Sequence, residues 1–316
     1  MRLLGKRYVK IAIIGYKNHA IRLKETLNKL GYNNVFTYNH KKDELDSLND
    51  SDIFFISSPN DTHYYWIKLL QKYNKYIFCE KPPVTTLDDL KEITSYNEKL
   101  YFNFNHRFTG LSKLAEKYLN SEELGKLLYI NCIITNGIAF KESFKNDWRF
   151  KGDDILSSII GNLGIHYIDL VGYLCGDIKE FNLEKLSVVS EELPDTTKMY
   201  MITDNVIVDI FLSYAAPFRN QVTMLFDNGI LELLDGKVTL QTPRDTIDKD
   251  GRFKPPDYMY LEIFNNSKEY YDNSLFESVG FFMKCYEQNK SISVKHYNQS
   301  IKTTKLLLDT LGEKHD

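Results

Sequence analysis

Short apolar runs alternate with helical patterns through the first third of the chain, and this alternation restricts the possible folds more than any other feature. The runs lie at residues 9–15, 35–38, 53–56, 76–79 and 100–105. Between the first two runs, Leu23, Leu27 and Leu30 recur at helical spacing before Gly31. Strands that alternate with helices in this way are typical of a parallel, doubly wound sheet. We therefore predict an α/β domain of this kind over residues 1–120.

The remainder of the chain has a different pattern. A long strand is expected at residues 127–135 and a long apolar helix at residues 154–174. Strands at hairpin spacing then follow from residue 186 to residue 234, and the links between them contain Asp, Asn and Gly. Successive antiparallel strands form a sheet separate from a parallel one. Residues 121–316 are therefore expected to form a second, α+β domain with a mainly antiparallel sheet.

Composition and charge narrow the possible partners. The 316 residues include 40 basic and 43 acidic side chains, which gives a formal net charge of -3. This balance argues against a nucleic-acid surface or a binder of anionic membranes. No apolar run approaches the ~20 residues of a membrane span, and the run at residues 11–15 is too short for a secretory signal. The four cysteines lack metal-binding or redox spacing. We expect a cytoplasmic protein with a small-molecule ligand and without a metal site.

The turn after the fourth apolar run places a lysine at a strand end. Residues 76–79 are apolar, and Glu80, Lys81 and two prolines follow. Because proline cannot donate to a sheet ladder, the strand must stop at Lys81. Ligands of open parallel sheets bind at this carboxyl edge. Lys81 is therefore a candidate to hold an anionic group or to exchange a proton, although a solvated loop charge explains these residues equally well.

The first strand-to-helix turn is a candidate dinucleotide site. Dinucleotide-binding turns follow the pattern G-x-G-x-x-G, in which glycines let the backbone approach the pyrophosphate. Here Gly15 is the first glycine, Lys17 replaces the second, and Ala20 replaces the third. Lys17 would crowd the backbone approach but would also bring a positive charge, with Asn18 next to it.

The end of the second predicted strand indicates which dinucleotide binds. An NAD site usually carries an acidic residue there, which binds the ribose hydroxyls. This chain instead has His40 and Lys41, and its first acid is Asp43. Basic residues at this point favour the 2′-phosphate of NADP over NAD, although a basic surface turn is the alternative.

Three polar residues align on the predicted apolar helix. Asn162, His166 and Asp169 follow i, i+4 and i+7 spacing, so they share one helix face. Polar groups on a buried helix require partners or a cavity. An Asp one turn beyond a His can orient its imidazole. A satisfied core histidine is the alternative, and the alignment of three polar residues favours a site.

Together these segments resemble the Gfo/Idh/MocA oxidoreductase family. The segments that match in order are Ile11–Gly15, Ser57–His63, Cys79–Pro82, Phe104–Phe108, Trp148–Arg149 and Gly161–Asp169. The resemblance implies a Rossmann domain, then a domain with an open-faced, mainly antiparallel sheet that often mediates homodimers or homotetramers. It also implies hydride transfer between nicotinamide and a sugar, sugar-nucleotide or polyol carbonyl or hydroxyl group.

The resemblance also assigns roles to individual residues. The candidate cofactor-binding set, including the two turns described above, is Gly15, Lys17, Asn18, His40, Lys41, Ser57, Ser58, Pro59, Asn60, His63, Glu80, Lys81 and Asn105. The resemblance places Lys81 near the nicotinamide and the substrate oxygen, often before a cis proline, and makes His166 the acid/base. The candidate substrate-binding set is Trp148, Arg149, Asn162, His166 and Asp169.

One departure from the family pattern keeps other functions open. Sugar dehydrogenases of this family usually have an Asp four residues before the histidine, where this chain has Asn162. Asparagine hydrogen-bonds but does not titrate, so Lys81 and His166, with Asn162 beside them, form the candidate catalytic set. The alternatives to a sugar oxidoreductase are an imine-type reductase and a non-catalytic ligand-binding relative with an altered cofactor turn.

Overall fold

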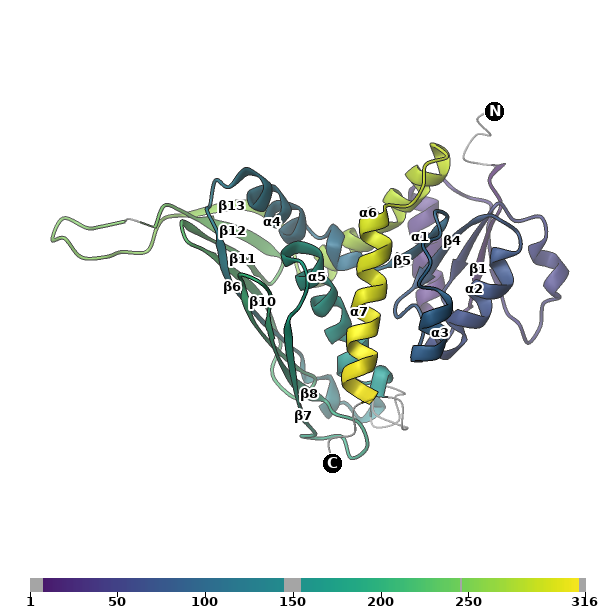
Figure 1. The fold of residues 1–316 in the computed structure, drawn as a ribbon, viewed down its shortest axis with the longest axis horizontal. Coiled ribbons are helices and arrows are strands. Elements are labelled where there is room, and N and C mark those ends of the chain that lie inside the picture. The colour runs from purple at the N-terminus through teal and green to yellow at the C-terminus, as the bar shows by residue number, and fades with distance from the viewer. Residues whose placement is uncertain (1–7, 145–154, 245, 313–316) are drawn as a thin grey trace. The chain divides into compact units, whose positions relative to one another are not determined.

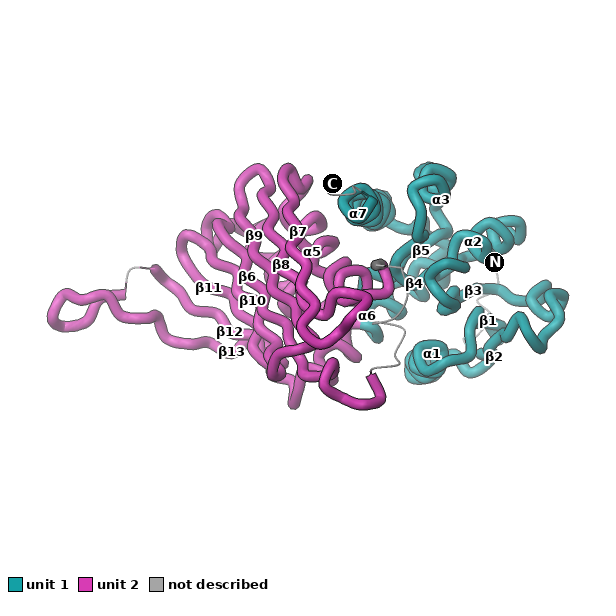
Figure 2. The backbone as a smooth tube through the Cα atoms, turned by 90° about the horizontal axis from the view of Figure 1, so that it is seen from below, with its two compact units in different colours: residues 1–105, 275–316 teal, residues 106–274 magenta. Residues whose placement is uncertain are grey.

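The protein, analysed as a computed structural model, divides into two compact units. The structure describes residues 8–144, 155–244 and 246–312. Unit 1 comprises Met1–Asn105 and Leu275–Asp316, and unit 2 comprises His106–Ser274 (Figure 2). This division differs from the expected domains 1–120 and 121–316, because the last part of the chain returns to unit 1.

Unit 1 contains the predicted parallel sheet. Its five strands run in the order β2-β1-β3-β4-β5, and every neighbouring pair is parallel. The strands are β1 (Ile11–Ile14), β2 (Val35–Tyr38), β3 (Ile53–Ile56), β4 (Tyr76–Glu80) and β5 (Leu100–Asn103) (Figure 1). Strands β1, β3, β4 and β5 are buried along their whole length, as expected for a sheet covered on both faces.

The helices of unit 1 follow the predicted alternation. They are α1 (Asn18–Lys29), α2 (His63–Gln71), α3 (Leu87–Glu92), α6 (Ser267–Glu287) from residue 275 onward, and α7 (Val294–Gly312). Thr86 caps α3, because its side chain accepts a hydrogen bond from the Asp89 amide. Helix α7 packs against α3 and β5, and this packing places the end of the chain in unit 1.

Unit 2 is built on an eight-stranded sheet in the order β13-β12-β11-β10-β6-β9-β8-β7. Its strands are β6 (Leu127–Thr135), β7 (Glu180–Leu186), β8 (Thr196–Ile202), β9 (Ile207–Ser213), β10 (Arg219–Phe226), β11 (Gly229–Leu234), β12 (Lys237–Gln241) and β13 (Tyr258–Ile263). Neighbouring strands are antiparallel except for the parallel pair β6 and β9. The predicted fold class, a parallel sheet followed by a mainly antiparallel one, is confirmed.

Two helices accompany this sheet, α4 (Gly110–Ser121) and α5 (Ile165–Cys175) (Figure 1). Helix α4 packs against α5 and β11. Gly164, directly before α5, lies against Met199 and Leu212, which are buried on β8 and β9. Alternate residues of the same strands, such as Phe211, are exposed. Among the described residues, no helix combines the length and the apolar character that a membrane crossing requires.

Candidate active site

The turn after β1 has room for backbone but not for a side chain. Gly15 has a φ of +133°, a conformation that favours glycine. A Cβ atom on Gly15 would lie 2.6 Å from the carbonyl oxygen of Ser57. Gly15 follows β1 and Ser57 follows β3, the two adjacent strands at which the strand order of the sheet reverses. This is the point where open α/β sheets bind their ligands.

The Ser57 hydroxyl supports the same location. Its oxygen is buried and has no hydrogen-bond partner among the described residues. Buried hydroxyl groups in folded proteins normally have a partner. A polar group bound beside the Gly15 turn would supply one, so Gly15 and Ser57 together fit a dinucleotide at this strand edge.

Lys17 fits the altered glycine turn without strain. It is the N-cap residue of α1, with φ of -87° and ψ of -174°, values that any residue adopts. Lys17 and Asn18 are both exposed. Lys17 thus begins α1 at the helix end that attracts anions, and its predicted crowding of a bound pyrophosphate stays a prediction.

The basic turn after β2 also contains a carboxylate. His40 and Lys41 are exposed, as expected for a site that would meet a 2′-phosphate. The side chain of Asp43 turns back, and its Oδ2 accepts a hydrogen bond of 2.6 Å from the Asn39 amide. The Asp43 carboxylate thus lies at Asn39, the first residue after β2, although Asp43 follows four residues later in the sequence.

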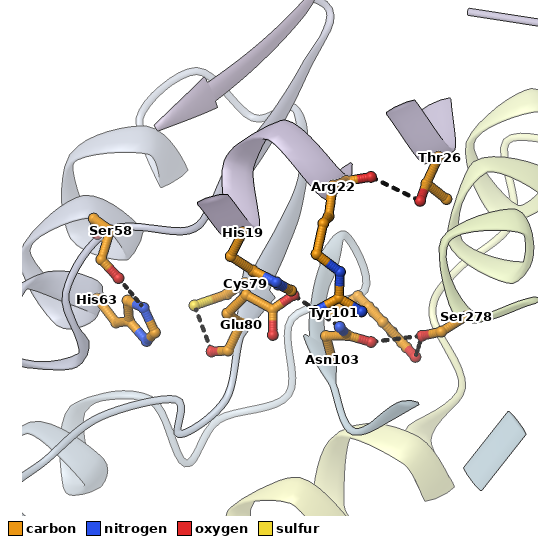
Figure 3. Close-up of polar contacts among 10 residues, drawn as sticks. All are labelled: His19, Arg22, Thr26, Ser58, His63, Cys79, Glu80, Tyr101, Asn103 and Ser278. Atoms are coloured by element: carbon orange, nitrogen blue, oxygen red, sulfur yellow. Dashed lines mark hydrogen bonds and ion pairs between the residues drawn. The ribbon is translucent and has the colours of Figure 1, made fainter. Parts of the chain in front are cut away.

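His63 ties together the turns that follow β3 and β4. It begins α2 and is fully buried. Its Nδ1 lies 2.7 Å from the Pro82 carbonyl oxygen. Its Nε2 lies 3.0 Å from the Ser58 carbonyl oxygen, a contact drawn in Figure 3. A neutral imidazole donates to one of these carbonyls, whereas an imidazolium donates to both. Burial lowers the pKa of His63 and outweighs the two carbonyl contacts, which raise it.

The loop between these contacts contains Pro59 and Asn60. Residues Asn60–Thr62 form a short 3-10 turn before α2. The Thr62 hydroxyl lies 2.7 Å from both the Ser58 hydroxyl and the Pro59 carbonyl oxygen. The Ser58–Asn60 segment is therefore fixed at the carboxyl edge of the sheet, where the resemblance expects cofactor contacts.

Glu80, the last residue of β4, is the centre of a polar cluster. Its Oε1 lies 2.7 Å from His19 Nε2 and accepts a hydrogen bond of 2.8 Å from Asn103 Nδ2 (Figure 3). Burial would raise the pKa of the Glu80 carboxyl, but His19, Asn103 and Lys81 together lower it. Glu80 is thus an anion at neutral pH, held inside the fold by a histidine from α1 and an amide from β5.

The donors of this cluster form a directional chain. The Ser278 hydroxyl donates to Asn103 Oδ1 at 2.7 Å. Because that hydroxyl has a single proton, it must accept from the Tyr101 hydroxyl, which lies 2.7 Å away. We call His19, Glu80, Asn103 and Ser278 the carboxylate cluster.

Lys81 and Asn105 follow β4 and β5, respectively. Both are half-buried. The peptide bond between Lys81 and Pro82 is cis, as the resemblance implies. The positive charge of Lys81 also contributes to lowering the pKa of the Glu80 carboxyl.

In unit 2, the helix that carries the predicted polar residues begins irregularly. A 3-10 turn at Ile155–Ser157 is followed by a π-helical turn at Ile160–Gly164, and regular α5 starts only at Ile165. The prediction of a single regular helix from residue 154 is therefore wrong. The 3-10 turn lies so close that a Cβ atom on Gly161 would be 2.2 Å from the Leu156 carbonyl oxygen.

Asn162 and Asp169 have different surroundings. Asn162, in the π turn, is half-buried and donates a hydrogen bond of 2.9 Å to the Tyr214 hydroxyl. Asp169 is fully buried and accepts from Arg107, with Nε at 2.7 Å from Oδ2 and Nη2 at 2.5 Å from Oδ1. Both partners of this ion pair are withdrawn from solvent, and the substrate contact of Asp169 stays a prediction.

His166 is half-buried and stacks on a second histidine. The ring centroids of His166 and His106 lie 4.3 Å apart, with an angle of 19° between the planes. His166 belongs to unit 2 and Lys81 to unit 1. Trp148 and Arg149 lie outside the described residues. No group of three or more metal-ligating side chains is found within the described ranges.

The structure adds residues that the sequence patterns did not select. His19 and Asn103 contact Glu80, while His106 and Arg107 contact His166 and Asp169, respectively. Three of them lie close to a predicted position: His19 adjoins Asn18, and His106 and Arg107 follow Asn105. Only their distances in the fold reveal these contacts.

The parallel sheet reverses its strand order at a turn that has no room for a side chain. A buried hydroxyl without a hydrogen-bond partner among the described residues lies beside this turn, and together these features are typical of a dinucleotide-binding domain. Comparison with protein families agrees. The profile described as "Oxidoreductase family, NAD-binding Rossmann fold" matches residues 9–101, and the "GFO/IDH/MocA C-terminal domain" profile matches residues 113–232. The chain belongs to the Gfo/Idh/MocA oxidoreductase family.

Curated relatives of the chain include two sugar dehydrogenases. It is 26% identical over 163 residues to levoglucosan dehydrogenase of Pseudarthrobacter phenanthrenivorans, an alignment that covers 50% of this chain and 41% of the relative. It is 30% identical over 148 residues to glucose-6-phosphate 3-dehydrogenase of Bacillus subtilis, covering 44% of this chain and 42% of the relative. Both alignments thus span less than half of the curated relative.

A solved structure confirms the fold over nearly the whole chain. The structure of a levoglucosan dehydrogenase in complex with NADH and levoglucosan superposes with a TM-score of 0.72. It covers 96% of this chain and 98% of the other, at 16% sequence identity. At this identity the likeness establishes the shared architecture.

Proposed function

We propose that the protein is an NAD(P)-dependent oxidoreductase that transfers a hydride between nicotinamide and the carbonyl or hydroxyl group of a sugar, sugar nucleotide or polyol. The observation that carries this proposal is the Gly15 turn, which approaches Ser57 too closely for any side chain. That geometry, in a chain of this family, supports binding of a dinucleotide at the β1 and β3 edge. The similarity to two sugar dehydrogenases supports the substrate class.

When bound, the nicotinamide would supply or accept the hydride. The proposed roles of the protein side chains concern the proton and the position of the reacting oxygen. Lys81 would donate a hydrogen bond to that oxygen, since it follows β4 at the ligand-binding edge of the sheet. His166 would hold or take up the proton of the reacting hydroxyl. Asn162 would position a substrate hydroxyl, and Trp148 and Arg149 are proposed to contact the substrate.

NADP is the proposed cofactor, because exposed His40 and Lys41 would face a 2′-phosphate. Asp43 is the feature that opposes this choice, because its carboxylate lies at the Asn39 amide. A matched pair of variants separates the two influences. Lys41→Gln should weaken NADPH binding more than NADH binding, and Asp43→Asn should weaken NADH binding more than NADPH binding.

Titration of the purified chain with NADPH and with NADH, followed by nicotinamide fluorescence, tests the cofactor assignment. Binding that is lost in Gly15→Val supports the Gly15 turn as the cofactor site, because valine cannot adopt this backbone conformation without strain. Circular dichroism of Gly15→Val provides the folding control. If neither dinucleotide binds the wild-type chain, the oxidoreductase assignment is wrong, and a ligand-binding role without turnover is the better description.

Turnover assays test the reaction. A substrate panel should start from levoglucosan and glucose 6-phosphate, the compounds in the names of the relatives, and should include polyols, sugar nucleotides and cyclic imines. For a carbonyl substrate, His166→Ala should lower kcat by about 10²–10⁴-fold, the contribution of a general acid/base. Turnover that survives this substitution would favour an imine substrate, which depends less on a protein acid.

We also propose that the protein is a cytoplasmic homodimer or homotetramer. Exposed apolar side chains on the sheet of unit 2, including Ile207, Phe211 and Leu225, support self-association. The four free cysteines are consistent with a reducing compartment. Light scattering of wild-type protein and Phe211→Lys should show a loss of oligomer in the variant; a wild-type monomer would contradict the proposal.

A further inference from the structure

Three flat side chains form a continuous stack within unit 2. His106 stacks on His166 on one face, at 4.3 Å and 19°, and on Tyr271 on the other, at 4.8 Å and 23°. Tyr167 meets the His106 ring edge-on at 5.1 Å. We call His166, His106 and Tyr271 the ring column. His106 is its middle member and is 6% exposed.

Hydrogen bonds fix the Tyr271 end of the column. The Tyr271 hydroxyl donates to Asn220 Oδ1 at 3.1 Å, so it accepts from the Tyr167 hydroxyl at 3.0 Å. The Asn220 amide in turn donates to the Ser267 hydroxyl at 2.8 Å. Tyr271 is thus anchored to strand β10 and to the start of α6, and its ring provides a fixed surface beneath His106.

Weakly acidic side chains with raised pKa values lie close to the column in unit 2. Burial raises the pKa of Tyr271 to about 12 and also raises the pKa values of Tyr167 and Tyr270. Burial likewise raises the pKa of the nearby Cys132 thiol. Arg107 and Asp169, which lie close in the chain to His106 and His166, form an ion pair with each other.

We propose that His106 is a positioning residue for His166. Its ring stays neutral and sets the plane of the His166 imidazole, and the two rings together hold a single proton over the neutral pH range. This inference rests on the proposed acid/base role of His166. Two imidazolium rings in this stack would repel each other, and such pairs share their protons. His166 takes the proton because His106 is the more deeply buried ring, and burial disfavours charge.

Nuclear magnetic resonance titration of the 15N-histidine-labelled chain tests the sharing directly. In the wild type, His166 should titrate in one step and His106 should remain neutral until a lower pH. In His166→Phe, which keeps a flat ring without the charge, the midpoint of His106 should rise by about one pH unit or more. An unchanged His106 midpoint, or two histidines that both protonate independently near pH 6.5, would overturn the proposal.

His296 provides the internal control for this titration. It stacks on Phe281 at 5.0 Å and 17°, a similar geometry without a second imidazole, and belongs to unit 1. Its midpoint should be the same in the wild type and in His166→Phe. A shift in both histidines would indicate a general structural change and would count against specific sharing.

Kinetics of two His106 variants test the positioning role. His106→Phe keeps the stacked ring, whereas His106→Leu removes it. His106→Leu should lower kcat about tenfold more than His106→Phe, with little change in KM, because misplacing an acid/base affects the chemical step. Equal losses would refute positioning by stacking. A wild-type chain that binds no dinucleotide and turns over no substrate would refute the proposed function alone, since the titration still decides proton sharing.

Discussion

The two polar clusters of the molecule hold their histidines in different ways. The carboxylate cluster of unit 1 fixes His19 through an ionised Glu80, and each contact depends on a donor, an acceptor or a charge. The ring column of unit 2 fixes His166 through stacked faces. The first arrangement is sensitive to the loss of one proton or one oxygen. The second is sensitive to the loss of a flat shape.

This difference gives a simple rule for substitutions. A change that keeps shape but removes charge should damage the carboxylate cluster and largely spare the ring column. A change that removes a ring should do the reverse. Both clusters serve the same end, because each holds a titratable side chain in one orientation before any ligand arrives.

The largest effect should come from the charges beside the ring column. Asp169→Ala leaves the buried Arg107 guanidinium without its carboxylate, and an uncompensated buried charge costs about 3–5 kcal/mol of folding free energy. Urea unfolding followed by circular dichroism measures this loss. The double variant Arg107→Met with Asp169→Leu removes both charges and should be considerably more stable than the single variant. Equal stability of single and double variants would refute the buried pair.

Glu80→Gln tests the carboxylate cluster by keeping its shape. The amide oxygen can still accept from Asn103, but the charge that holds His19 is lost, so the variant should lose about 1.5–3 kcal/mol near pH 7. The folded-state pKa of Glu80 is lowered, so its contribution is present above about 4.5, its unfolded value, and disappears as pH falls through the folded value. Urea unfolding of both proteins from pH 7 downward should therefore converge in acid. A constant difference at every pH would exclude the charge as the cause.

His63→Gln should have a smaller effect with its own pH dependence. At pH 8 the neutral imidazole donates to one carbonyl and glutamine can do the same, so the expected loss of about 1–2 kcal/mol comes from replacing a fully buried ring with a side chain of different shape. The folded pKa of His63 is lowered, so the wild type has its full contribution above about 6.5 and loses it as pH falls toward the folded value. Thermal melts at pH 8 and pH 5.5 should show the two proteins becoming more alike in acid. A gap that widens on acidification would indicate that the imidazolium is the form that bridges Ser58 and Pro82.

The smallest effect is expected from Tyr271→Phe, which keeps the ring of the column. It removes one hydroxyl and leaves Asn220 Oδ1 and the Tyr167 hydroxyl each short of a partner, a loss of about 1 kcal/mol. Tyr271→Leu removes the ring as well and is the matched comparison. Calorimetric melting temperatures should rank the wild type first, then the phenylalanine variant, then the leucine variant. Equal melting temperatures for the two variants would contradict the importance of the stacked ring.

The sequence predicted unit 1 well because its determinants are local. Residues 53–56 and 100–103 are continuous apolar runs in a sheet buried on both faces, so each run is a strand almost to the residue. The Thr86 cap of α3 is likewise a local feature, since capping depends on residues within one turn.

Unit 2 shows where local patterns fail. A strand was expected to begin at Leu186, but β7 ends there. The amides of Val188, Val189 and Ser190 instead donate to the carboxylate of Asp195. This carboxylate replaces a sheet ladder, and no periodicity of hydrophobic residues encodes it.

The candidate site residues also differ in whether local sequence patterns could reveal them. The sequence could select Gly15, Ser57 and Lys81 as candidates because strand ends are visible in the sequence and line up at one edge of a parallel sheet. The His106 stack could not be found, because its partners lie on α5 and α6, far apart in sequence. The i, i+4, i+7 argument for Asp169 assumed a regular helix and did not reveal that Arg107 neutralises it.

The π turn before α5 makes the length of this segment as important as its composition. The amide of Ile165 bonds to the carbonyl of Ile160, so the turn contains one residue more than an α-helical turn. Deleting one residue between 160 and 164 would allow a regular helix but would rotate everything before it by about 100° relative to His166. A substitution at Asn162 leaves the number of residues in the turn unchanged, so the preceding residues keep their direction relative to His166. A one-residue deletion would change that direction for all of them. Natural or engineered variation here is therefore expected as exchanges of residues rather than as insertions or deletions.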